Sequence, residues 1–312
     1  MTDAAPPPPE LRLRRDAVRS GWSDDELGRL VRAGDLGRLR RGAYVNGVLP
    51  DDVAGVHRLL VRATLGGLRR PAVVSHQSAA VLHGLPLWDV ALDRVHITRR
   101  PPAWNIASSL LCCHVARLRD DEIVQIDGVQ VTSVVRTALD LARSLPHEAA
   151  VVTLDAALHG RLLDHDTLRA RLFDIAGTPG SRSATRAITF ADARSESVGE
   201  SRSRVILARW GLAPSALQLE IRTASGNRVG RADFAWEERG VLGEFDGRVK
   251  YGRLLRPGQE AGDAVFEEKR REDAVRDEGW GVVRWVWSDL RVPHRFATRV
   301  RRALERGGPG RR

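Results

Sequence analysis

Hydrophobic and polar positions alternate most regularly between residues 228 and 247. One alternating run covers 228–236 and a second covers 241–247, and the polar tetrapeptide Glu-Glu-Arg-Gly separates them. Two alternating runs joined by a short polar turn are typical of a β-hairpin. The pattern therefore predicts two adjacent antiparallel strands in this stretch.

Carboxylates occupy one end of this predicted hairpin. Because residues i and i+2 of a strand lie on one face, Asp233 shares a face with Arg231, and Glu244 shares a face with Asp246. Carboxylates gathered in this way repel one another unless a cation lies among them, and Mg²⁺ prefers oxygen ligands and leaves positions free for a phosphate. Two alternatives need no metal. Either the charges are solvated at the strand ends, or Arg231 or Arg284 neutralises them.

Further elements flank the hairpin on both sides. A helix is expected over 196–210, and it carries Glu200. A charged helix is expected over 263–278, and a strand over 281–287. The predicted order is helix, strand, hairpin, helix, strand.

The N-terminal region predicts a small helical module with a basic hairpin. Ser23 and Glu26 form a capping box ahead of a helix over 24–33, which Gly34 ends. Residues 36–45 partly alternate between apolar and basic around a glycine, as in a two-stranded wing. Helix, turn, helix and basic hairpin together favour a winged helix, whose second helix enters the major groove while its wing contacts phosphates. The N-terminal end of this module departs from the winged-helix layout, because a full first helix before Arg14 would fall in a proline-rich stretch.

The middle of the chain predicts mixed α/β structure. Helices are expected over 51–65, 74–84, 133–145 and 149–159, strands over 94–98 and 109–116, and a hairpin over 123–131. The sequence Gly-Thr-Pro-Gly-Ser at 177–181 is rich in turn residues and indicates a linker.

Composition narrows the class of protein. A chain of 312 residues with 42% apolar content is long enough for two or three globular domains. No run approaches the ~20 apolar residues of a membrane span. The first ten residues contain Pro6–Pro9 and no apolar signal region, which predicts a disordered tail and a cytoplasmic protein without a membrane partner.

The net charge of +10 and the pI of about 10.9 favour a nucleic-acid partner. Nearly all the positive charge is arginine, a skew that also fits a GC-rich genome, so the placement of the charges matters more than their number. Candidate DNA-binding residues lie on the N-terminal helix and the basic hairpin: Arg29, Arg32, Arg38, Arg40 and Arg41.

Histidine and cysteine give a weaker metal signal. The histidines at 76, 83, 96 and 114 match no compact zinc spacing, which favours hydrogen-bonded polar roles. Cys112 and Cys113 are adjacent in an apolar run and are expected to pack in a buried strand.

The C-terminal motifs resemble a known family. Glu200-Ser-Arg, Gly211-Leu-Ala-Pro, Gly230-Arg-Ala-Asp-Phe, Glu244-Phe-Asp-Gly and Gly279-Trp-Gly-Val-Val-Arg look like the small domain related to very-short-patch repair endonucleases, within the PD-(D/E)XK nuclease superfamily. The resemblance covers about residues 195–305.

This resemblance assigns roles to individual residues. It implies Asp233 as the first metal ligand, Glu244 as the second and Glu200 as the acid on the helix. The superfamily's usual lysine is replaced by Asp246, and Lys250 stands where related domains carry a histidine. A lysine there can supply positive charge near a scissile phosphate.

The N-terminal and middle regions resemble the AbiEi-type antitoxins of type IV toxin–antitoxin systems. Together the resemblances imply a multidomain α/β (α+β) protein: a tail over 1–10, a winged helix-turn-helix over 11–48, an α/β middle domain over 49–176, a linker over 177–194 and a restriction-endonuclease-like domain over 195–306.

Three functions fit these expectations. The first is a double-stranded-DNA-binding transcriptional regulator or antitoxin, with a toxin protein as partner and a nuclease-fold domain at its C-terminus. The second is a Mg²⁺-dependent DNA endonuclease addressed by its winged helix. The third is an interaction protein without enzymatic activity, whose nuclease fold is degenerate.

Overall fold

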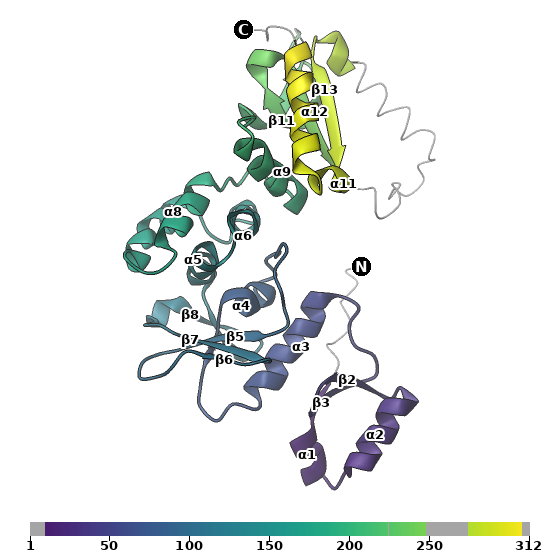
Figure 1. The fold of residues 1–312 in the computed structure, drawn as a ribbon, viewed down its shortest axis with the longest axis vertical. Helices are drawn as coiled ribbons and strands as arrows, with labels where there is room; N and C mark the ends of the chain where they lie inside the picture. The colour runs from purple at the N-terminus through teal and green to yellow at the C-terminus, as the bar shows by residue number, and fades with distance from the viewer. Residues whose placement is uncertain (1–9, 224, 248–273, 308–312) are drawn as a thin grey trace. The chain divides into compact units, whose positions relative to one another are not determined.

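The computed structural model describes residues 10–223, 225–247 and 274–307 of the chain. The fold is mixed α/β and divides into two compact units (Figure 1). The first unit comprises residues up to Leu145 together with Asp166–Ala184, and the second comprises Pro146–His165 together with the chain from Thr185 onward.

A three-stranded sheet with two helices opens the first unit. Its strands lie in the order β1 (Leu11–Leu13), β3 (Ala43–Asn46), β2 (Leu36–Arg40), and all neighbours are antiparallel. The helices are α1 (Arg14–Arg19) and α2 (Asp24–Ala33). A small apolar core forms where Ala17, Leu27 and Leu36 pack together.

The helix cap at Ser23 and the basic hairpin are confirmed in this region. Ser23 caps α2 by accepting a hydrogen bond from the Glu26 amide at 3.1 Å, and Gly34 ends the helix in the left-handed conformation with φ 85°. The first helix, α1, lies at Arg14–Arg19, after the proline-rich stretch in which a winged-helix layout would need its full first helix.

A six-stranded mixed sheet forms the body of the first unit. Its strands run in the order β6 (Ile106–Ala107), β7 (Leu111–Val115), β5 (Val95–Arg99), β4 (Val73–Val74), β9 (Val129–Thr132), β8 (Ile123–Ile126). Pairs β5–β7 and β4–β9 are parallel, whereas the other neighbours are antiparallel. Helices α3 (Val53–Leu65), α4 (His76–Leu82) and α5 (Val134–Ser144) belong to the same unit.

Buried ion pairs attach the segment after residue 165 to the first unit. Helix α7 (His165–Arg171) brings Arg171 to the buried carboxylate of Glu122, with an Nη2–Oε1 distance of 3.1 Å. Glu122 also pairs with Arg136 of α5 at 3.3 Å, and Arg136 binds Asp140 at 2.9 Å. Because charges removed from water must be compensated, these contacts fix the segment to this unit.

The second unit is built on a four-stranded sheet. Strands β10 (Ala216–Arg222), β11 (Arg228–Trp236) and β12 (Val241–Asp246) are antiparallel neighbours, and β13 (Gly281–Val286) runs parallel to β12. Helices α9 (Val198–Arg209) and α12 (Pro293–Arg306) contribute to one core with this sheet, and α12 crosses the sheet in Figure 1. The short helix α11 (Trp287–Leu290) links β13 to α12.

Aromatic side chains fill the core between this sheet and its two helices. Phe234 and Trp285 are fully buried with ring centroids 5.0 Å apart, and Trp236 and Phe245 join the same cluster. These positions alternate with Asp233 and Glu244, so the aromatic face and the carboxylate face of the sheet are opposite, as the hairpin pattern predicts.

The division between units differs from the predicted domain limits. Residues 177–194, expected to be a linker, contain helix α8 (Ser181–Phe190), because the turn residues at 177–180 end before a helix-forming stretch. Helix α6 (His147–His159), expected in the middle domain, belongs to the second unit. Its buried Asp155 pairs with Arg204 of α9 at 2.6 Å, and Glu148 pairs with Arg202 at 2.7 Å, so α6 is tied to α9 by charge.

Two further observations complete the comparison with the sequence. The helix predicted over 263–278 lies largely outside the described residues, within which 274–277 are helical. None of the helices in the described part of the chain combines the length and the apolar character required to cross a bilayer.

Candidate functional site

Strand register brings the predicted acidic residues together. Strands β11 and β12 pair from Trp236–Val241 back to Phe234–Gly243, so the next positions along, Asp233 and Glu244, flank the end of the paired segment. Beyond it the Asp233 carboxylate accepts a hydrogen bond from the amide of Phe245 at 2.8 Å. The side chain of Asp233 thus links β11 to β12 just beyond the last backbone-paired residues.

The pKa of Asp233 is strongly raised by its surroundings. Burial raises its pKa from the ordinary 3.8 to about 6, the hydrogen bond from Phe245 opposes that rise, and the nearby charges of Glu200 and Glu244 add to it. In the described part of the chain no basic side chain forms an ion pair with Asp233. Among the described residues, the longer-range charge of Arg231 favours the ionised form only weakly compared with the effect of burial.

Glu244 has a partner from the neighbouring strand. The parallel register of β12 and β13 sets Glu244 beside Arg284, and Arg284 Nε donates to Glu244 Oε2 at 2.7 Å. The Arg284 side chain is 36% exposed and that of Glu244 20%, so the pair sits at the surface of the site. Of the two arginines expected to neutralise the cluster, Arg284 therefore contacts Glu244, whereas Arg231 pairs with Glu196 at 2.8 Å.

Glu200 is held by the start of its own helix. Ser197 caps α9 by accepting from the Glu200 amide, and its hydroxyl donates to Glu200 Oε1 at 2.6 Å. The amide of Glu196, the residue before the cap, donates to Glu200 Oε2 at 3.0 Å and holds the second carboxylate oxygen. This arrangement gives Glu200 a structural role and fixes its negative charge close to Asp233.

Gln218 is a residue of this site that the sequence analysis missed. It lies on β10 between Leu217 and Leu219, which pair with β11 on either side of Asp233, and its backbone has φ 54°. Its amide nitrogen donates to Glu200 Oε2 at 2.9 Å. A left-handed conformation at a residue other than glycine is strained and persists where surrounding contacts enforce it. No local sequence signal identifies this role, because it depends on the register of β10 against β11.

The two remaining predicted residues contribute differently. Asp246 is exposed at the end of β12, at the edge of the acidic cluster. Lys250 lies outside the described residues. The second unit thus gathers Asp233, Glu244 and Glu200 around one end of its sheet, with Arg284 and Gln218 as their polar neighbours.

The N-terminal arginines divide into two groups. Arg29 and Arg32 on α2, and Arg38 and Arg41 on the hairpin, have exposed side chains. Arg40 instead turns inward, where its Nη2 donates to the carbonyl of Ala63 at 3.0 Å. Arg40 therefore ties the hairpin to α3, and four of the five predicted DNA-binding arginines face solvent.

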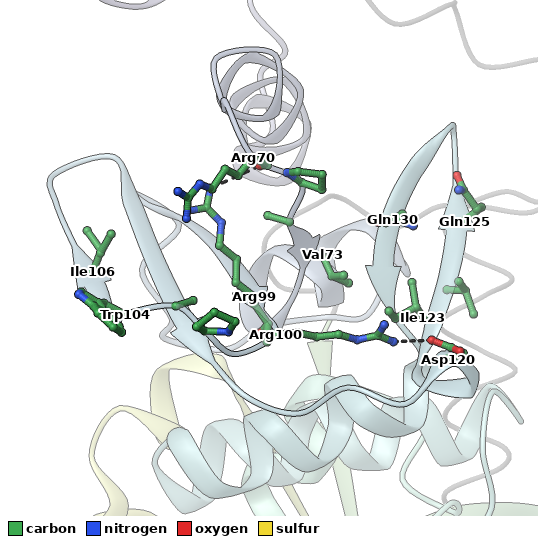
Figure 2. Close-up of a pocket in the computed structure, with 16 residues that line it drawn as sticks. Arg70, Val73, Arg99, Arg100, Trp104, Ile106, Asp120, Ile123, Gln125 and Gln130 are labelled. Carbon is green, nitrogen blue, oxygen red and sulfur yellow. Dashed lines mark hydrogen bonds and ion pairs between the residues drawn. The ribbon is translucent and has the colours of Figure 1, made fainter.

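A hollow in the first unit carries further cationic groups. Its cavity measures about 960 Å³, and Figure 2 shows Arg70, Arg99, Arg100 and Trp104 among its lining side chains. Arg100 reaches Asp120 at 2.5 Å, and Arg99 Nη2 donates to the carbonyl of Arg70 at 3.4 Å. An exposed indole beside guanidinium groups suits a ligand with both an aromatic ring and a negative charge.

One cluster of metal-binding side chains lies away from the carboxylates. Within the described ranges, the group of three possible ligand atoms that all lie within 4.8 Å of one another belongs to His96, Cys112 and His114 of the first unit. The acids of the second unit are spaced more widely than this, in keeping with the ion pair and the capping contacts that hold Glu244 and Glu200.

Comparison with known proteins gives relatives in one organism. No family model matches the chain. Two proteins of Mycobacterium tuberculosis, uncharacterized protein MT2308 of strain CDC 1551 / Oshkosh and uncharacterized protein Rv2248 of strain ATCC 25618 / H37Rv, are each 30% identical to it over 184 residues, or 58% of this chain. The chain spans 64% of the length of these curated relatives.

Among solved structures, the crystal structure of RV2827C protein from Mycobacterium tuberculosis resembles this chain with a TM-score of 0.39 and 16% identity. The match covers 58% of this chain and 72% of that one. The names of these three proteins state no activity, so a function for this chain has to be inferred from its own residues.

Proposed function

We propose that this chain is a DNA-binding protein of the regulator or type IV antitoxin kind, with a nuclease-type domain as its second unit. In that domain Asp233 and Glu244 bind a divalent cation such as Mg²⁺. The observation that carries the proposal is the half-buried carboxylate of Asp233, which has no ion-pair partner among the described residues and lies beside two further acids.

The order of elements in the second unit supports this proposal. A helix, three antiparallel strands and a fourth strand parallel to the third place the acids on α9, β11 and β12. This is the arrangement that the resemblance to PD-(D/E)XK nucleases implies. The three acids come from separate elements that fold together, which supports a shared cation site.

The donor set fits a hard cation. Carboxylate oxygens are the ligands Mg²⁺ prefers, and it commonly uses one or two of them together with water and substrate phosphate. A cation bound at Asp233 would stabilise its ionised form, because no ion pair to this carboxylate is present among the described residues. A bound Mg²⁺ supplies charge stabilisation for a phosphate and lowers the pKa of a coordinated water.

Among the described residues, Arg284 is the cationic residue that contacts a proposed metal ligand. Asp246 occupies the place of the superfamily's usual lysine, so the positive charge for a phosphate has to come from elsewhere. The Arg284 guanidinium contacts Glu244 and is partly exposed, and its planar group can bind a phosphate through two parallel hydrogen bonds. We therefore assign phosphate binding in this site to Arg284.

The arginines of the first unit support DNA binding. Four exposed guanidinium groups lie on α2 and on the neighbouring hairpin. Arginine side chains that neutralise phosphates release condensed counterions, which gives affinity without sequence preference. The cationic hollow of Figure 2, in the same unit, offers a second place for a nucleotide.

A cleavage assay tests the enzymatic part of this proposal. Supercoiled plasmid and linear duplex DNA are incubated with the full chain and Mg²⁺ or Mn²⁺, and nicked and linear products are followed on gels. Nicking is expected for the wild type and for Glu238→Gln, which changes an exposed acid outside the site. Nicking is expected to be lost in Asp233→Asn. Intact DNA with the folded wild type under both metals refutes the nuclease role.

One observation favours a second candidate function. The ion pair between Glu244 and Arg284 already compensates one of the two proposed ligands without a metal. In this second candidate function, the second unit binds no metal and acts as an interaction domain without catalytic activity. The protein then binds DNA through its first unit alone. DNA binding that persists with no cleavage and no Mn²⁺ uptake would select this function.

A further inference from the structure

Three possible metal ligands share one face of the parallel strands β5 and β7. The register pairs His96 with Cys112 and Thr98 with His114, and paired positions of parallel strands point to the same face. Ile97 and Cys113 point to the opposite face, where they enter the apolar core with Val61. The two adjacent cysteines therefore have different environments.

Two of the three ligand separations are typical of ligands around one ion, and all three ligand atoms lie within 4.8 Å of one another. His96 Nδ1 is 3.0 Å from His114 Nε2, and Cys112 Sγ is 3.5 Å from the same nitrogen. A tetrahedral Zn²⁺ site with Zn–N bonds near 2.0–2.1 Å and a Zn–S bond near 2.3 Å separates two nitrogens by about 3.3 Å, and a nitrogen from a sulfur by about 3.6 Å. The observed separations differ from these values by a few tenths of an ångström.

We propose that His96, Cys112 and His114 bind a Zn²⁺ ion. Two imidazole nitrogens and one thiolate form a borderline-soft donor set, which suits Zn²⁺ and disfavours Mg²⁺, Ca²⁺ and Mn²⁺. Imidazole binds metal in its neutral form. The Cys112 thiol releases its proton to solvent when it becomes a ligand.

His76 positions the ligands and is not one of them. Its ring stacks on His114 with centroids 3.7 Å apart and planes 15° from parallel, so its lone pairs do not point at the ion that His114 would hold. His76 has φ 52°, and its Nδ1 lies 3.0 Å from Ser75 Oγ, which accepts a hydrogen bond from Thr98 at 2.8 Å. A strained residue fixed by such contacts keeps the facing ring in place.

The exposure of the three ligand residues indicates a four-coordinate ion with three protein ligands. All three ligand residues are partly exposed, so water can reach the ion from the open side of the cluster. Three protein ligands with an open fourth position are typical of zinc sites that exchange a water or bind a substrate, whereas structural sites use four protein ligands. The Zn²⁺ proposed here therefore has solvent as its fourth ligand.

Titration of the tag-free full chain with Co²⁺, followed by competition with Zn²⁺, tests this proposal. Co²⁺ bound by a thiolate gives a charge-transfer band in the near ultraviolet that carboxylate ligands do not give, so the acids of the second unit are distinguished. One Co²⁺ per chain is expected, together with visible bands of tetrahedral intensity. Zn²⁺ is expected to displace the Co²⁺ completely.

Matched variants identify the ligands. Cys112→Ser is expected to abolish the charge-transfer band, and His114→Gln is expected to weaken binding at least tenfold. Cys113→Ser and His83→Gln are expected to leave both unchanged, since Cys113 points into the core and His83 contacts the carbonyl of Thr132. Circular dichroism checks that each variant is folded.

Two results would overturn the zinc site. One is a folded wild type that gives no charge-transfer band and no Zn²⁺ binding by calorimetry. The other is a band that persists in Cys112→Ser and disappears in Cys113→Ser. Neither result bears on the carboxylate site, whose ligands and preferred metal differ.

Discussion

Replacing Asp233 by asparagine is expected to stabilise the protein in metal-free buffer at neutral pH. The change removes the charge and keeps an oxygen that can accept from the Phe245 amide. Burial raises the folded-state pKa of Asp233 from 3.8 to about 6, and each pKa unit corresponds to about 1.4 kcal/mol. The ionised carboxylate therefore lowers the free energy of unfolding by up to about 3 kcal/mol above pH 6.

The pH dependence has a definite sign. Between pH 3.8 and about 6 the unfolded chain has lost the Asp233 proton while the folded chain keeps it, so wild-type stability falls as pH rises through this window. Below it both states are protonated, and the advantage of Asp233→Asn disappears. Other titrating groups are common to both proteins and cancel in the comparison.

Urea denaturation in the presence of EDTA, followed by circular dichroism and tryptophan fluorescence, measures this difference at pH 7.5 and pH 4. Glu244→Gln is the matched control, because it breaks the ion pair with Arg284 and is expected to cost about 1 kcal/mol. If Asp233→Asn is less stable than the wild type at pH 7.5, the Asp233 carboxylate is a structural partner of a basic group, and the reasoning fails.

Three further changes have expected outcomes. Phe234→Ala removes a fully buried ring and is expected to cost ~3–5 kcal/mol in urea denaturation. Gly199→Ala sets a Cβ against the ring of Phe245 and is expected to cost about 1–3 kcal/mol, which Phe245→Leu in the same chain partly restores. Replacing the exposed N-terminal arginines by alanine is expected to weaken duplex binding and flatten its salt dependence by about 0.9 per lost phosphate contact, measured by fluorescence anisotropy. Lysine at the same positions is expected to keep the salt slope; the positions are Arg29, Arg32, Arg38 and Arg41.

Local sequence signals predict much of the secondary structure. The capping box at Ser23, the left-handed Gly34 and the alternation across 228–247 each act within a few residues, and the structure has the expected helix and hairpin there. The hairpin over 123–131 is likewise present as β8 and β9. Short-range stereochemistry and periodicity are sufficient for such elements.

Elements that depend on distant partners are not predictable in this way. Strand β1 spans three residues and forms because Leu11–Leu13 pairs with β3, 30 to 34 positions later. Helix α6 was expected with the middle domain, but buried ion pairs to α9 place it in the second unit. The sequence between α6 and α9 gives no indication that α6 belongs to the second unit.

The two candidate sites also differ in how far the sequence alone predicts them. Asp233 and Glu244 are predictable because a tight turn fixes their register. The pairing of Glu244 with Arg284 requires knowledge of the parallel register of β12 and β13. Parallel strands bring His96, Cys112 and His114 together, so these residues have no compact spacing in the sequence. The sequence does indicate that Cys112 and His114 share a face, because they are two residues apart on one strand.

Calorimetric titration of the metal-free full chain with Mn²⁺ tests the central claim most directly. Mn²⁺ prefers the oxygen ligands of the second unit to the histidine and cysteine cluster of the first. One binding site is expected in the wild type and in His114→Gln, with the binding heat lost in Asp233→Asn and in Glu244→Gln. Absence of binding heat in the folded wild type, or equal heat in all four proteins, would contradict a cation site at Asp233 and Glu244.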